Sequence, residues 1–108
     1  TVPQKRMTEE LATKNMIYQL LRDMRAMKVA AGSMSRDQIS ANLKNIFEIV
    51  HSNFRHEWLL SLEVYEIALK YSFEDVAASA LEDLDAVKLE HPQLAGTIND
   101  GIKLAVKI

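Results

Sequence analysis

The sequence predicts an all-α fold, a compact bundle or a set of stacked hairpins with about five helices. Gly and Pro are rare, at three and two residues of 108, whereas β-sandwiches and barrels need many of them in turns. Apolar residues recur at three- and four-residue spacing along most of the chain, as they do in amphipathic helices. The stretch 58–69 is apolar around most of a helix and is interrupted only by Ser61, Glu63 and Glu66. A helix of that kind is buried, so the other helices should cover it.

The first two helices are expected near 8–31 and 35–52. Glu9 and Glu10 lie where the dipole of the first helix favours acidic residues, and Gly32 is expected to end this helix. Ser35 and Gln38 have the spacing of a capping box at the start of the second. The predicted core stripes are Ile17, Leu20, Leu21, Met24, Met27 and Ala31 in the first helix and Ile39, Leu43, Ile46, Phe47 and Val50 in the second.

The other three helices are expected near 56–71, 72–91 and 93–107. Ser72 is the predicted N-cap of the fourth helix, and Pro92 should separate the fourth from the fifth, which can kink or shorten at Gly101. The predicted buried residues are Ala77, Ala80, Leu81, Leu84 and Val87 in the fourth helix and Leu94, Ile98, Ile102 and Ala105 in the fifth. The acidic residues expected to face solvent are Glu74, Glu82, Asp83, Asp85 and Glu90.

Length and composition predict one soluble domain over residues 1–108. Of the residues, 48% are hydrophobic and 26% charged, which is ordinary for a globular protein. The absence of cysteine excludes disulfides, thiolate catalysis and cysteine zinc sites. No apolar run reaches the length of a membrane span and no signal peptide is visible, so we expect a cytoplasmic protein without a membrane partner. The chain begins with Thr, which fits processing, a trimmed tag or a piece of a longer protein.

No residue pattern in the chain predicts catalysis, a metal site or a cofactor site. His56-Glu57 begins like a zinc-protease helix motif, but Leu60 stands where the second histidine is needed. Glu63 and Glu66 lack the Glu-x-x-His spacing of di-iron bundles. The three glycines are scattered and form no phosphate-binding loop. We therefore expect no catalytic residue, metal ligand or cofactor in this domain.

Charge and methionine distribution mark the candidate partner contacts. Residues 1–36 carry seven basic and three acidic residues, whereas the remaining residues carry six basic and twelve acidic ones. Arg22, Arg25 and Lys28 recur at three-residue spacing, which predicts either an anion contact or a solvated face. Met24 and Met27 belong to a group of methionines that fits either an adaptable partner surface or core filling. The basic residues are too sparse for a nucleic-acid footprint, so nucleic acid is not an expected partner.

Three segments of the chain together resemble part of a known protein family. The main segment is 53–66, NFRHEWLLSLEVYE, with its Trp-Leu-Leu followed by Leu-Glu-Val. The other two are 91–104, HPQLAGTINDGIKL, and 14–25, KNMIYQLLRDMR. These segments resemble the C-terminal extension of long bacterial aromatic amino acid hydroxylases of the phenylalanine 4-monooxygenase type, with 14–25 similar to its start and 91–104 to its end. The matching residues are mainly packing residues and cover much of the chain.

This resemblance implies a non-catalytic accessory domain that serves assembly or regulation of an iron-dependent, pterin-using monooxygenase. The iron ligands of the family, two histidines and a glutamate, would lie in a preceding catalytic domain, and no residue here matches that motif. The expected partner is a protein, either a second copy of the chain or the flanking catalytic domain.

Two other functions stay open from the sequence. One is a small helical ligand-binding or enzymatic domain that uses Glu63, Glu66 and a histidine, which predicts a polar cavity beside the helix 56–71. The other is an anion- or nucleic-acid-contacting adaptor that uses Arg22, Arg25 and Lys28.

Overall fold

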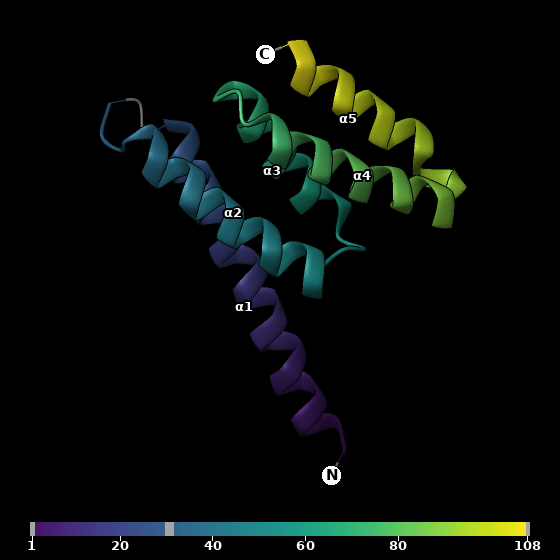
Figure 1. Cartoon of the computed structure of the whole chain (residues 1–108). Helices are drawn as coiled ribbons and strands as arrows, with labels where there is room; N and C mark the ends of the chain where they lie inside the picture. Colours follow the sequence, from purple (N-terminus) through teal and green to yellow (C-terminus); the bar gives the residue numbers. More distant parts are fainter. Residues whose placement is uncertain (1, 30–31, 108) are drawn as a thin grey trace.

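The computed structural model describes residues 2–29 and 32–107, with side chains from residue 10 onward, and this part of the chain is all-α (Figure 1). The helices are α1 (Val2–Val29), α2 (Arg36–Asn53), α3 (Trp58–Lys70), α4 (Glu74–Glu90) and α5 (Ala95–Lys107), with a short 3-10 helix η1 (Pro92–Leu94) before α5. The predicted fold class and the predicted order of helices are confirmed.

The predicted start of the first helix near Thr8 is wrong, because α1 begins at Val2. Pro3 lies in the first turn, where the amide hydrogen that proline lacks has no helical partner anyway. The residues that follow, Gln4 to Met7, are good helix formers, so nothing delays the helix until Thr8. At the other end Gly32 has a φ of 86°, in the left-handed region that ends a helix, as predicted. Residues 30 and 31, including the predicted core residue Ala31, lie outside the described residues.

The capping box predicted for the second helix is confirmed. The Ser35 hydroxyl accepts from the Gln38 amide at 3.1 Å, and the Ser35 amide donates to the Gln38 side chain at 3.0 Å. The buried residues of α2 follow the predicted stripe and are Ile39, Leu43, Ile46 and Val50. Phe47 lies half-buried at its edge.

Helix α3 lies at the centre of the molecule and contacts α1, α2, α4 and α5. Its buried apolar residues are Leu60, Val64, Tyr65, Ile67 and Ala68, while Trp58 is half-buried. Ser61 is also buried, at 1% exposed. The prediction that the apolar helix is covered by the others is confirmed, apart from Leu59 at 57% and Leu69 at 37% exposed.

The turn between α3 and α4 differs from the prediction that Ser72 caps the fourth helix. The N-cap of α4 is Phe73, and no side chain caps it. Ser72 instead ends α3 in the left-handed conformation, with a φ of 61°. The Phe73 amide donates to the Ala68 carbonyl and the Ser72 amide to the Leu69 carbonyl, which together form a Schellman motif. The turn is so short that Ser72 is used to end α3 and cannot also begin α4.

Helices α4 and α5 form the remaining side of the bundle (Figure 1). Ala77, Ala80, Leu84 and Val87 of α4 are buried as predicted, with Leu81 half-buried. In α5, Ile98 and Ala105 are buried and Ile102 is half-buried, and the helix runs unbroken through Gly101. Leu94, predicted to be buried in the same helix, is half-buried at the end of η1. A Cβ at Gly101 would lie 2.7 Å from Leu62 Cδ2, so this glycine allows α5 to approach α3 closely.

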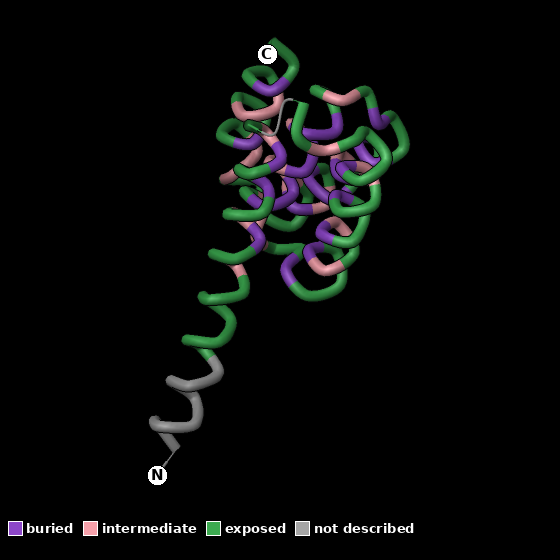
Figure 2. The backbone as a smooth tube through the Cα atoms, turned by 90° about the vertical axis from the view of Figure 1, so that its left-hand side faces the viewer, coloured by how far each residue is buried: buried purple, intermediate pink, exposed green. Residues whose placement is uncertain are grey.

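One end of α1 extends beyond the bundle (Figures 1 and 2). Residues 10–19 are exposed except for Ile17, which is half-buried, and α1 enters the core at Leu20. The molecule is elongated, with principal extents of 50, 34 and 18 Å. None of the described helices combines the length and the apolar character that crossing a membrane requires.

Candidate interaction surface

The side chains of α1 divide into a core face and an opposite exposed face. Leu20, Met24 and Met27 face the core and are at most 5% exposed. The opposite face follows steps of three and four residues over about 27 Å of helix. We name it the α1 stripe; its residues are Leu11, Lys14, Tyr18, Arg22, Arg25 and Val29. It therefore combines three apolar and three cationic side chains in one exposed line.

The apolar members of the α1 stripe are largely exposed to solvent. Leu11 is 59% exposed, Tyr18 is 66% and Val29 is 81%. The cations Lys14, Arg22 and Arg25 are exposed too, and within the described residues they form no ion pair or side-chain hydrogen bond. These groups are available to a partner without breaking any interaction of the folded chain.

Lys28 does not share a face with Arg22 and Arg25, contrary to the sequence prediction. Six residues span well over one and a half turns, so Lys28 points toward α3 while the two arginines point to solvent. Its ammonium forms ion pairs with Glu63 and with Glu66, the latter at 2.7 Å between Nζ and Oε2. The three side chains are about one-quarter exposed.

The pKa of Lys28 is raised above its ordinary value of 10.5. Burial alone would lower this pKa. The hydrogen bonds to Glu63 and Glu66 and the charges of these carboxylates raise it, and together they outweigh the effect of burial. The Lys28 cluster therefore holds a charged ammonium between two carboxylates and joins α1 to α3. The sequence did not indicate this pairing, because the residues are more than thirty positions apart.

Met24 and Met27 are core residues, so the interpretation that they contact a partner is wrong for the folded chain. Met24 is 0% and Met27 3% exposed. The alternative interpretation, core filling, holds for both. Met16 is 49% exposed, and Met34 is half-buried beside the groove between α1 and α2.

The prediction that Asp83 faces solvent is also wrong, because Asp83 is 6% exposed and contacts His51 of α2. His51 Nδ1 lies 2.8 Å from Oδ2 and 3.0 Å from Oδ1 of Asp83. Its other nitrogen, Nε2, lies 3.1 Å from the Arg55 guanidinium, and Phe47 stacks on the ring. Since arginine is always a donor, Nε2 accepts and Nδ1 carries the proton that Asp83 accepts. This imidazole has both nitrogens engaged and links α2 to α4.

The residues proposed for a small enzyme do not come together. Glu63 and Glu66 contact Lys28, whereas the three histidines are elsewhere: His51 beside Asp83, His56 exposed beside Glu57, and His91 exposed after α4. Across the described residues, no cluster of three His, Asp or Glu side chains is placed to hold a metal ion.

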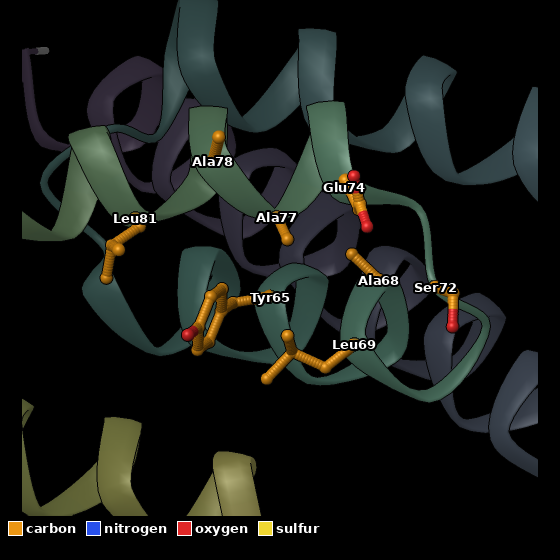
Figure 3. Close-up of a pocket in the computed structure, with 8 residues that line it drawn as sticks. All are labelled: Tyr65, Ala68, Leu69, Ser72, Glu74, Ala77, Ala78 and Leu81. Atoms are coloured by element: carbon orange, nitrogen blue, oxygen red, sulfur yellow. The ribbon is translucent and has the colours of Figure 1, made fainter.

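A shallow groove of about 340 Å³ runs between α3 and α4 (Figure 3). Tyr65, Ala68 and Leu69 line it from α3, with Ser72 in the turn. The α4 residues on its other side are Glu74, Ala77, Ala78 and Leu81. It is an apolar surface with one carboxylate at its edge, and it lacks the convergent polar groups of a small-molecule site.

No known protein family, curated protein or solved structure matches the chain.

The burial of Asp83 and the line of the α1 stripe could both have been predicted from the sequence. Asp83 lies three residues after Ala80 and four before Val87, so its spacing places it on the core face of α4. Likewise, the line from Leu11 to Val29 follows from spacing once α1 is known to be a single helix over both residues. The Lys28 cluster had no such signal, because it depends on how α1 packs on α3.

Proposed function

We propose that the chain is a non-catalytic helical interaction domain that binds a protein partner through the α1 stripe. The observation that carries this proposal is that one end of α1 extends beyond the bundle (Figure 2) and that the described residues 10–16 there are all exposed. Leu11 and Tyr18 on this part of α1 are 59% and 66% exposed. Isolated helices of this length are marginal in water, and apolar side chains in the open add no stability. A partner that covers the α1 stripe would supply the packing that residues 10–16 of α1 lack.

The composition of the α1 stripe fits a protein partner. Tyrosine and arginine are the side chains most enriched at the energetic centres of protein interfaces, and both occur here beside aliphatic residues. Three cations over about 27 Å are sparse for binding nucleic acid, and the net charge of −2 adds no long-range attraction to a polyanion. The anion-contacting adaptor is therefore the weaker alternative, and it retains only Arg22 and Arg25 of its three proposed residues.

The hydroxylase resemblance gives this proposal a specific setting. In a long aromatic amino acid hydroxylase, such a domain would serve assembly or regulation, and the iron and pterin would belong to the catalytic domain. The partner of the α1 stripe would then be that domain or a second subunit. The enzymatic alternative has less support, because Lys28 occupies both Glu63 and Glu66.

Site-specific photocrosslinking tests the proposed function. A photoreactive phenylalanine analogue replaces Tyr18, and crosslinking is carried out in cells of the organism that produces the protein. The control carries the same analogue in place of Ser52, an exposed residue of α2. We expect a discrete adduct from position 18 that position 52 does not give. If position 18 gives no adduct, or the same adducts as position 52, the α1 stripe is not a binding surface and the proposal fails.

A further inference from the structure

Helix α4 has an exposed stripe that matches the α1 stripe in size and carries the opposite charge. It follows one face of α4 over about 22 Å, and we name it the α4 stripe. Its residues are Glu74, Ala78, Leu81, Glu82, Asp85 and Leu89, all of them exposed except Leu81, which is half-buried. Leu89 is 84% exposed, and the Asp85 side chain is 54% exposed and forms an ion pair with Lys88 within α4, at 2.8 Å between Oδ1 and Nζ. The α4 stripe thus has three acidic and three apolar residues, whereas the α1 stripe has three cationic and three apolar residues.

The charges of the two stripes also have the same spacing. Lys14, Arg22 and Arg25 are separated by eight and three positions, and Glu74, Glu82 and Asp85 are separated by eight and three positions in the same order. A parallel pairing of the two helices therefore aligns all three cations with all three carboxylates. An antiparallel pairing aligns at most two of them.

The same register brings apolar side chains together. It places Tyr18 opposite Ala78 and Val29 opposite Leu89. Ala78 is small and exposed, and it borders the groove between α3 and α4, which has about 340 Å³ of space (Figure 3). A tyrosine ring laid on Ala78 would cover this groove, with Leu81 at its side. Tyrosine anchors set against apolar pockets are the usual energetic centre of protein interfaces.

The two stripes cannot meet within one molecule. Helices α1 and α4 make no contact in the described structure, and α3 contacts both (Figure 1). Resting on the proposed function, we propose that the partner of the α1 stripe is the α4 stripe of a second copy of the chain, in parallel register. A nucleic acid or an anionic membrane would explain the cations alone and would leave the α4 stripe without a role. Such a contact joins unlike surfaces, so it either closes by symmetry into a dimer or continues into longer assemblies.

Charge reversal with light scattering tests this proposal. Arg22→Glu/Arg25→Glu reverses the α1 stripe, and Glu82→Arg/Asp85→Arg reverses the α4 stripe. The matched control is Lys103→Glu/Lys107→Glu, which changes two exposed lysines of α5 and alters net charge as much as the first variant does. We expect the unaltered chain and the control to associate at low salt and to dissociate as salt rises. Each stripe variant should associate roughly tenfold or more weakly, because two attractive pairs become repulsive.

Restoration of the contact gives the decisive result. The two stripe variants have complementary faces with reversed charges, so a chain that carries all four substitutions should associate again. Circular dichroism shows whether each variant keeps its fold, and Tyr18→Ala, which leaves the core untouched, should weaken association as well. The monomer mass at every concentration, or association that the stripe variants leave unchanged, overturns the proposal.

The outcomes separate this proposal from the proposed function. If the chain stays monomeric but position 18 gives an adduct with another protein, the proposed function stands and the proposal that the partner is a second copy fails. A monomeric chain whose α1 stripe binds phosphatidylserine vesicles or a DNA duplex, with loss in Arg22→Glu/Arg25→Glu, overturns both.

Discussion

Ser72 shows how one residue at a turn fixes the relation between two helices. Its left-handed backbone, at a φ of 61°, ends α3 and lets Phe73 begin α4 without a linker. Arg36 of α2 donates to the carbonyls of Tyr71 and Ser72 and lies 4.8 Å from the centre of the Phe73 ring. The position thus combines a strained conformation with hydrogen bonds that hold the turn in place.

We expect Ser72→Gly to stabilise the protein. A side chain in the left-handed region costs about 1–2 kcal/mol, which glycine does not incur, although glycine gives a more flexible unfolded chain. The net gain should be about 0.5–1 kcal/mol, measured by urea unfolding. The control is Ser79→Gly in the middle of α4, which should destabilise by a similar amount. Equal destabilisation by both substitutions would show that Ser72 bears no strain.

Single residues also mark where sequence reasoning succeeded and where it did not. The capping box of Ser35 and Gln38 was predictable because it is a local hydrogen-bond pattern with fixed spacing. Ser72 had the right residue type for a cap, but the length of the turn decided its role. Asp83 was assigned to solvent by its charge, although its spacing placed it on the core face, where His51 accounts for its burial.

Side chains from α3 and from the turn after it hold the C-terminal end of α1. The Tyr71 hydroxyl donates to the Met27 carbonyl at 2.8 Å, and the Lys70 ammonium donates to the Lys28 carbonyl. These carbonyls lie in the last turn of α1, where helical partners are missing. Together with the ion pairs of Lys28, they fix α1 on α3 at one end while the other end extends into solvent.

The Lys28 cluster predicts a specific dependence of stability on pH. The pKa of Lys28 is raised in the folded chain, so the folded state holds the proton more tightly than the unfolded state. The stabilisation that the charged Lys28 gives to the folded state is fully present below the pKa of 10.5 in the unfolded chain. It is lost as pH rises through the higher pKa of the folded chain. Lys28→Met should therefore destabilise the protein by about 1 kcal/mol at pH 7 and by progressively less above pH 10.5.

Urea unfolding of the unaltered chain and of Lys28→Met over pH 7–11.5 measures this difference, and Lys14→Met serves as the control because Lys14 is exposed and unpaired in the described structure. A stability difference between Lys28→Met and the unaltered chain that stays constant across this range would contradict a raised pKa at Lys28.

At the scale of elements, the order and approximate bounds of the helices were predictable from periodicity. Their pairing was not, because short connections between helices leave the packing angles open. The separation of Lys28 from Arg22 and Arg25 has a different cause, because a three-residue spacing drifts around the helix and leaves only the two arginines on the exposed face. The central position of α3 was predictable, since its apolar residues surround most of its circumference.

The whole molecule consists of a packed bundle and an arm, residues 10–16 of α1, whose side chains do not contribute to the core. Among the residues whose side chains the structure describes, the buried ones begin at Leu20 and continue through α2 to α5, whereas residues 10–16 are exposed throughout. A helix without packing is held by its own hydrogen bonds and by propensity, which make a small contribution. The bundle and the arm should therefore respond differently to the same perturbation.

Removal of residues 1–12 should leave the bundle intact. No residue of the described part of this segment is buried, so its loss takes nothing from the core. We expect the thermal midpoint of the dilute chain to change by less than about 4 °C, which corresponds to less than about 1 kcal/mol for a domain of this size. Helical circular dichroism should fall only by the share of the deleted residues.

Removal of residues 1–21 is the matched comparison, because it also takes away Leu20 and the half-buried Ile17, and it should lower the midpoint substantially. A large drop in midpoint for the dilute shorter deletion would mean that the arm stabilises the bundle itself and is not reserved for a partner.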